Sequence, residues 1–279
     1  MDTVPANGLR FAYLSEGTGP LVLLLHGFPD TAHTWDRTLR EVAAAGFRAV
    51  APFMRGYAPS EIPADGDYDV DTLGRDVLAL IEALGERHAI VVGHDWGAAA
   101  AYSAASLDPD RLRMLVTVAI PHPRALKPTP WLLWKQRHFL VLRRANAGAR
   151  VRENNFAYVD ELWHRWSPAW KAIPASETAA VKQAFAEPGR AEAAAAYYSF
   201  VSIRPPASYR AQIKVPAVAF AGEHDVIDSR AYEKARHCFD ASYEVVIVPG
   251  GHFMHREHPD AFVPELVRVL KDHEPRLRR

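Results

Sequence analysis

An aspartate between two glycines is the residue best placed to do chemistry in this chain. The segment Gly93-His94-Asp95-Trp96-Gly97 follows an apolar run, 89–92, and precedes a stretch of small residues, 98–101. This order predicts a strand, a sharp turn and the start of a helix, with Asp95 at the turn. A carboxylate with an ordinary pKa of about 3.9 is ionised at neutral pH. We therefore expect Asp95 to attack an sp3 carbon directly, opening an epoxide or breaking a carbon–halogen bond.

Two later segments offer a base and an acid. Gly250-Gly251-His252-Phe253 follows the last predicted strand, and of the chain's 13 histidines only His252 has this position. Asp225 closes the segment Ala221-Gly222-Glu223-His224-Asp225, which follows the preceding strand. We assign Asp225 as the acid that orients His252, with Glu223 and Asp228 as nearby competitors. The loop after 115–120 holds His122 and no carboxylate, so it offers no acid.

Short apolar runs that alternate with helical patterns must position these residues. Several runs lack polar alternation, as expected for strands buried on both faces of a parallel sheet. The predicted strands are 21–25, 48–51, 89–92, 115–120, 217–221 and 243–248. Apolar residues recur at helical spacing over 72–84 and 259–270. The alternation predicts an α/β fold with a mostly parallel, doubly wound sheet.

The alternation stops between about Pro121 and Ile213. This insert holds two alanine-rich helical stretches, 179–186 and 191–196, and five of the seven tryptophans: Trp131, Trp134, Trp163, Trp166 and Trp170. We predict that residues 122–213 form a helical cap over the carboxyl edge of the sheet, where ligands bind in open α/β folds. Residues 1–121 and 214–279 then form the core. Alternatively, the tryptophans form only a small core of a second layer.

These motifs resemble the epoxide hydrolase branch of the α/β-hydrolase superfamily over nearly the whole chain. Haloalkane dehalogenases share the aspartate turn but usually carry asparagine at the position of Phe28. Fluoroacetate dehalogenases typically place arginines where this chain has Trp96 and small residues. The resemblance therefore favours the epoxide hydrolases. The matching segments are His26-Gly27-Phe28-Pro29, Arg55-Gly56-Tyr57, Gly93 to Gly97, Gly222 to Asp225, and Gly251-His252-Phe253 with Glu257 and Pro259.

The resemblance implies further parts of an active site. The backbone amides of Phe28 and Trp96 are expected to form an oxyanion hole, and the bond before Pro29 is expected to be cis. Two cap tyrosines donate hydrogen bonds to the epoxide oxygen in this family, and Tyr198 matches the second of them. The usual place of the first holds Arg137-His138-Phe139, so His138 or Tyr158 is the candidate replacement. We further assign three aromatic residues to substrate binding: Trp35, Tyr158 and Tyr197.

The expected reaction has two steps. Asp95 forms an alkyl ester with the substrate while Tyr198 stabilises the leaving alkoxide. His252, oriented by Asp225, then activates the water that hydrolyses the ester. No metal or cofactor is required. Haloalkane dehalogenation through the same Asp95, with the Trp96 indole holding the halide, is the alternative. A non-catalytic binding protein of this fold is a third interpretation.

Charge balance, cysteine count and the length of apolar runs indicate the compartment and the kinds of partner to expect. The 279 residues include 33 basic and 33 acidic side chains, and this balance argues against a nucleic-acid partner. A single cysteine, Cys238, excludes an internal disulfide and fits a reducing compartment. The first residues lack the features of a signal peptide, and no apolar run approaches the roughly 20 residues that span a bilayer. We therefore expect a cytoplasmic protein that acts on a small apolar epoxide or related electrophile, without a membrane partner. A homodimer is left open.

Overall fold

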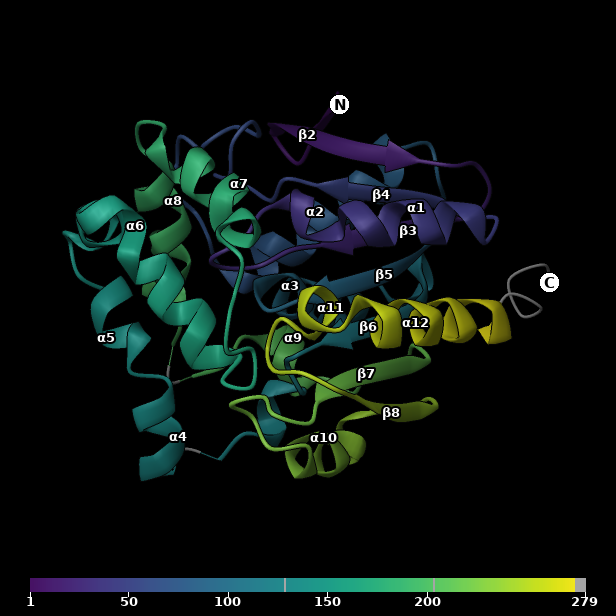
Figure 1. Cartoon of the computed structure of the whole chain (residues 1–279). Helices are drawn as coiled ribbons and strands as arrows, with labels where there is room; N and C mark the ends of the chain where they lie inside the picture. Colours follow the sequence, from purple (N-terminus) through teal and green to yellow (C-terminus); the bar gives the residue numbers. More distant parts are fainter. Residues whose placement is uncertain (128, 203, 274–279) are drawn as a thin grey trace.

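A mostly parallel sheet forms the centre of the molecule (Figure 1). The structure is a computed structural model, which describes residues 1–127, 129–202 and 204–273. The sheet has eight strands in the order β1-β2-β4-β3-β5-β6-β7-β8. Strand β2 is antiparallel to both of its neighbours, β1 and β4, and all pairs from β4 to β8 are parallel. The strands are β1 Asp2–Ala6, β2 Leu9–Glu16, β3 Leu21–Leu25, β4 Arg48–Pro52, β5 Ala89–His94, β6 Leu112–Val118, β7 Ala217–Gly222 and β8 Tyr243–Val248. The predicted fold class is confirmed.

All six predicted strands are present, and β6 differs most from its expected bounds. It starts at Leu112 and ends at Val118, because Ala119 has a positive φ of 65° that turns the chain. The hairpin of β1 and β2 was not predicted. Asn7 and Gly8 connect its strands with φ of 43° and 77°, as a two-residue hairpin turn requires.

Helices cover both faces of the sheet. In Figure 1, α1 (Asp36–Ala44) and α12 (Pro259–His273) lie together in front of the strands, while α2 (Val70–Ala83) and α3 (Trp96–Leu107) pack against each other. Two short helices, α10 (Arg230–Lys234) and α11 (Met254–Glu257), follow β7 and β8. The predictions over 72–84 and 259–270 correspond to α2 and α12 and are confirmed. The side chains of β3 and β5 are all buried, so the core lies along the central strands.

The described chain between β6 and β7 is helical and lies at one end of the strands (Figure 1). The alanine-rich predictions fall in α7 (Ala175–Ala186) and α8 (Arg190–Ala196). The division into core and cap domains stays a prediction. Trp163 and Trp166 are buried here, whereas Trp131 and Trp134 are exposed. Among the described residues, no helix combines the length and apolar character that crossing a membrane requires. The helices are α4 Pro130–Lys135, α5 His138–Leu142, α6 Ala147–Trp166, α7 Ala175–Ala186, α8 Arg190–Ala196 and α9 Ala207–Arg210.

Candidate active site

Asp95 occupies a strained turn between β5 and α3. Its φ of 52° and ψ of −117° lie in a sparsely populated region, and the turn presents its carboxylate beyond the strand. Close packing requires glycine at Gly97 in this turn and at Gly27 in the loop after β3. A Cβ at Gly97 would lie 2.4 Å from the Leu25 carbonyl oxygen, and one at Gly27 would lie 2.3 Å from Asp95 Oδ1. These two glycines therefore allow the neighbouring backbone to approach Asp95.

Three titratable side chains meet at this turn. His252 Nε2 lies 3.6 Å from Asp95 Oδ2, and His252 Nδ1 lies 3.7 Å from Asp225 Oδ1. Both distances exceed a hydrogen bond but lie within the range of an ion pair. The competitors Glu223 and Asp228 are exposed, and Asp228 pairs with Arg230. The structure thus brings Asp95, His252 and Asp225 together.

The backbone around His252 is fixed from several sides. Its amide donates to the Trp166 carbonyl at 2.9 Å, and its own carbonyl accepts from His94 Nε2 at 3.0 Å. The Gly251 amide donates to Glu257 Oε2 at 2.7 Å. The carboxylate of Glu257, which belongs to the motif quoted for the resemblance, therefore acts as a positioning group for the histidine loop.

Charges at the site stabilise one another. Burial disfavours a charged imidazole, but the carboxylates of Asp225 and Asp95 outweigh this effect and raise the pKa of His252 to about 9. Burial acts to raise the pKa of Asp95, yet His252 and the Phe28 amide hold it below its ordinary value. At neutral pH the site therefore contains an ionised Asp95 facing a protonated His252.

The amide of Phe28 lies where an oxyanion donor was predicted. It donates to Asp95 Oδ1 at 2.8 Å, and the Phe28–Pro29 bond is cis as expected. Trp96 is the first residue of α3 and directly follows Asp95. Its amide role stays a prediction.

A mainly apolar cavity of about 290 Å³ opens over Asp95 and His252. Tyr198, His138, Trp96 and Trp166 contribute to its walls. Tyr198 lies in a short helix, η4 (Tyr197–Phe200), with its ring centre 5.3 Å from that of Trp96 and 5.5 Å from that of His138. The predicted donor Tyr198 and the candidate His138 are thus neighbours on the cavity wall.

Burial sets the protonation of both groups. It raises the pKa of Tyr198 well above its ordinary value, and the nearby Asp95 adds to the effect. Burial, with a smaller effect from Arg165, lowers the pKa of His138 to about 3. The phenol therefore keeps its proton and the imidazole is neutral, so each can act as a hydrogen-bond donor at neutral pH.

Three predicted substrate-binding residues, Trp35, Tyr158 and Tyr197, are not among the residues that line this cavity, so their role in substrate binding stays a prediction. Trp35 is fully buried and stacks on His255 with ring centres 4.7 Å apart. Tyr158, on α6, is buried with its hydroxyl unpartnered among the described residues. Trp35 and Tyr158 are thus packed inside the fold, away from the cavity lining.

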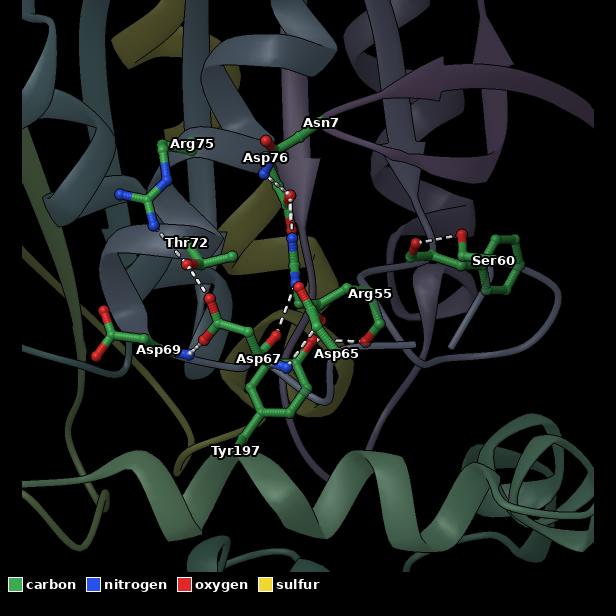
Figure 2. A network of polar contacts seen from close by, with 11 residues as sticks. Asn7, Arg55, Ser60, Asp65, Asp67, Asp69, Thr72, Arg75, Asp76 and Tyr197 are labelled. Atoms are coloured by element: carbon green, nitrogen blue, oxygen red, sulfur yellow. Dashed lines mark hydrogen bonds and ion pairs between the residues drawn. The ribbon is translucent and has the colours of Figure 1, made fainter. Parts of the chain in front are cut away.

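Tyr197 belongs to a buried polar network that Figure 2 shows. Its hydroxyl donates to the Arg55 carbonyl at 2.8 Å. The Arg55 guanidinium in turn makes two hydrogen bonds of 2.5 Å to the Asp76 carboxylate, and Asn7 donates to the same carboxylate at 2.7 Å. Sequence reasoning assigned no role to Arg55, although it belongs to a quoted motif. Because Tyr197 directly precedes Tyr198 in η4, the network also fixes the backbone next to Tyr198.

Comparison with known proteins places these features in context. Residues 20–259 match the family model described as alpha/beta hydrolase fold. The chain is 32% identical to YfhM of Bacillus subtilis (strain 168), an AB hydrolase superfamily protein, over 95% of both chains. It is 28% identical to epoxide hydrolase 3 of Mus musculus over 96% of this chain and 76% of that protein.

Solved structures give the same picture of the fold. The Bacillus megaterium epoxide hydrolase, solved with an inhibitor, superposes with a TM-score of 0.85 and 23% identity, covering 98% of this chain and all (100%) of that chain. At this identity the likeness concerns the fold alone.

Within the described residues, no group of three or more histidine, cysteine, aspartate or glutamate side chains is arranged to hold a metal ion.

Proposed function

Since the chain belongs to the α/β-hydrolase family, in its epoxide hydrolase branch, we propose that it hydrolyses epoxides to vicinal diols through a covalent ester on Asp95. The observation that carries this proposal is the placement of the Asp95 carboxylate. One oxygen accepts from the Phe28 amide at 2.8 Å, and the other lies 3.6 Å from His252 Nε2 at the cavity floor. The resemblance to a named epoxide hydrolase over nearly the whole chain supports the choice of substrate class.

In the first step, Asp95 Oδ2 attacks an epoxide carbon and the C–O bond of the ring breaks. The ring oxygen leaves as an alkoxide and receives a hydrogen bond from the Tyr198 phenol, which holds its proton at neutral pH. His138, on the same wall, is the second donor. The apolar walls exclude water from this step, which strengthens both hydrogen bonds.

In the second step, His252 must lose its proton. Ester formation removes the negative charge of Asp95, one of the two carboxylates that raise the pKa of His252. The alkoxide gains a proton as His252 loses one, so the net charge of the site does not change. Neutral His252 then takes a proton from water, and the resulting hydroxide attacks the ester carbonyl. The Phe28 amide, already on Oδ1, stabilises the oxyanion together with the Trp96 amide. As this intermediate collapses, the bond between the ester carbonyl carbon and Oδ2 breaks, and the leaving diol oxygen takes the proton of the added hydroxide. Asp95 is again a carboxylate and His252 is again protonated.

The experiment that tests the reaction class is a panel of epoxides and haloalkanes, with diol and halide measured separately. We expect diol from the epoxides with wild-type protein and none with Asp95→Ala. Asp95→Asn is a poorer control, because deamidation restores the acid. Trp96 lines the cavity, as the dehalogenase alternative requires. Halide release that is faster than diol formation would replace the proposal by that alternative.

A further inference from the structure

Helices α4 and α5 carry an exposed apolar surface among basic side chains. Four large apolar side chains within ten residues are more than half exposed: Trp131 at 54%, Leu133 at 59%, Trp134 at 57% and Leu140 at 70%. Figure 1 shows both helices at the outer edge of the helical segment, away from the sheet. We call these four residues, together with Lys127, Lys135, Arg137, Arg143 and Arg144, the α4–α5 surface.

Charge is strongly segregated in this part of the sequence. Between Asp110 and Glu153 the chain holds ten Arg and Lys residues and no Asp or Glu, although the whole chain has 33 of each sign. None of the five cations of the α4–α5 surface forms an ion pair with a carboxylate of the described residues. Instead, the Lys135 ammonium lies 5.2 Å from the Trp131 ring centre, and the Arg137 guanidinium lies 4.4 Å from that of Trp134.

From this arrangement we propose that the α4–α5 surface docks on a bilayer that contains anionic phospholipid. Tryptophan and leucine side chains insert at the level of the headgroups, while lysine and arginine are attracted to the negative surface. A second copy of this chain fits less well, because a two-fold contact would place the same cations against each other. We expected no membrane partner because no apolar run is long enough to span a bilayer. Docking on the surface of a bilayer needs no such run.

The same helices form one wall of the reaction cavity. From α4 and α5 and their connection, Leu132, Lys135, Gln136, His138 and Phe139 line it. Trp131, Leu133 and Trp134 are exposed to solvent. A docked protein would hold its cavity beside a bilayer in which apolar epoxides dissolve. This consequence rests on the proposed function, whereas the binding itself does not.

The test is co-sedimentation of the full chain with vesicles of equal parts phosphatidylglycerol and phosphatidylcholine, and with phosphatidylcholine alone. We expect binding to the anionic vesicles that weakens with added salt. Arg143→Gln/Arg144→Gln should weaken it by at least about 10-fold, because each basic side chain contributes roughly five-fold near such a surface. Trp134→Ser/Leu140→Ser should weaken it similarly. The matched controls Arg40→Gln/Lys271→Gln and Ile247→Ser, on exposed residues of α1, α12 and β8, should bind like wild type.

Two outcomes overturn the proposal. One is equal sedimentation with both kinds of vesicle, and the other is binding that the α4–α5 variants leave unchanged. Dimerisation that the same variants abolish, without vesicle binding, would assign the surface to a second copy instead. Diol formation from a water-soluble epoxide, expected to be unchanged in every variant, is measured alongside. Failure of wild type to hydrolyse any epoxide would refute the proposed function while leaving a positive vesicle result intact.

Discussion

At the scale of single residues, the main consequence of the site's geometry is that Asp95 and Asp225 both stabilise the protonated form of His252. The two carboxylates overcome the burial of His252 and raise its pKa to about 9. A histidine that is charged at rest cannot act as a base until one carboxylate is neutralised. In the proposed mechanism the attack by Asp95 does this, so the first step prepares the second.

This coupling predicts a pH dependence. The folded pKa of His252 lies near 9, above the ordinary value of 6.5, so its protonation stabilises the fold fully below about pH 6.5 and is lost as pH rises through 9. Asp225→Asn should lower this pKa and reduce the loss of stability between these values. The measurements are NMR titration of the imidazole, assigned with His252→Gln, and urea unfolding at several pH values. Titration of wild-type His252 near 6.5 would contradict the prediction.

The cavity wall predicts which phenol matters. Tyr198→Phe should slow ester formation by at least about 10-fold, and by up to roughly 10⁴-fold if His138 does not compensate, because an alkoxide needs a donor as it leaves. His138→Gln in the same background should deepen the loss. Tyr158→Phe is the matched control and should have no effect, since Tyr158 does not line the cavity. Rapid-quench kinetics with an aryl epoxide measures each rate, and an unaffected Tyr198→Phe would refute the assignment.

The sequence predicted which residues meet at the ends of the strands, but it could not predict which aromatic rings face the cavity. Asp95, Asp225 and His252 each follow a strand, so the carboxyl edge of a parallel sheet brings them together. Position along the chain cannot show which way a ring points. Tyr197 and Tyr198 are neighbours in η4, yet Tyr197 bonds Arg55 while Tyr198 lines the cavity.

At the scale of elements, the Arg55–Asp76 pair fixes the loop after β4 against α2 and, through Tyr197, against η4 (Figure 2). Both side chains are buried, at 3% and 7% exposed. A charge left alone in such a place is costly, because neither water nor a partner solvates it.

Asp76→Ala should therefore lower the free energy of unfolding by about 3–5 kcal/mol. Urea denaturation followed by circular dichroism measures the change. Asp272→Asn, which removes one of several exposed partners of Arg268, is the matched control and should have a much smaller effect. Equal losses in the two variants would show that the buried pair does not have this role.

Elements without a strong pattern were missed. The hairpin of β1 and β2 lies at the sheet edge with many exposed residues, so it lacks the apolar runs of the central strands. Its Asn7-Gly8 turn was the available signal. Helix α6 is interrupted at Glu153–Phe156, where Asn154, Asn155 and Phe156 have positive φ, so no continuous helical period marks it.

At the scale of the whole molecule, a tryptophan of α6 joins the helical segment to the sheet core. The Trp163 indole donates to the Pro29 carbonyl at 3.1 Å, and its ring stacks on Phe253 with centres 3.8 Å apart. Both partners are next to residues of the site, Phe28 and His252. The strand and helix alternation predicted the overall arrangement, but these contacts depend on side-chain packing that no period encodes.

Trp163→Ala should disturb stability and chemistry together. Loss of the buried ring is expected to cost about 3–5 kcal/mol, and ester formation should slow because Pro29 and Phe253 lose their support. Trp170→Ala, a partly buried neighbour, is the control and should cost less. Thermal unfolding and single-turnover rates give both quantities. A variant that is destabilised but reacts at the wild-type rate would argue against coupling of the helical segment to the site.

The most direct test of the covalent mechanism is intact-protein mass spectrometry of His252→Gln after mixing with an epoxide that wild type hydrolyses. Asp95 needs no base for the first step, whereas hydrolysis of the ester does. We predict that the variant gains the mass of one substrate molecule and that the added mass maps to the peptide containing Asp95. Unmodified His252→Gln, or modification at another residue, would contradict the mechanism.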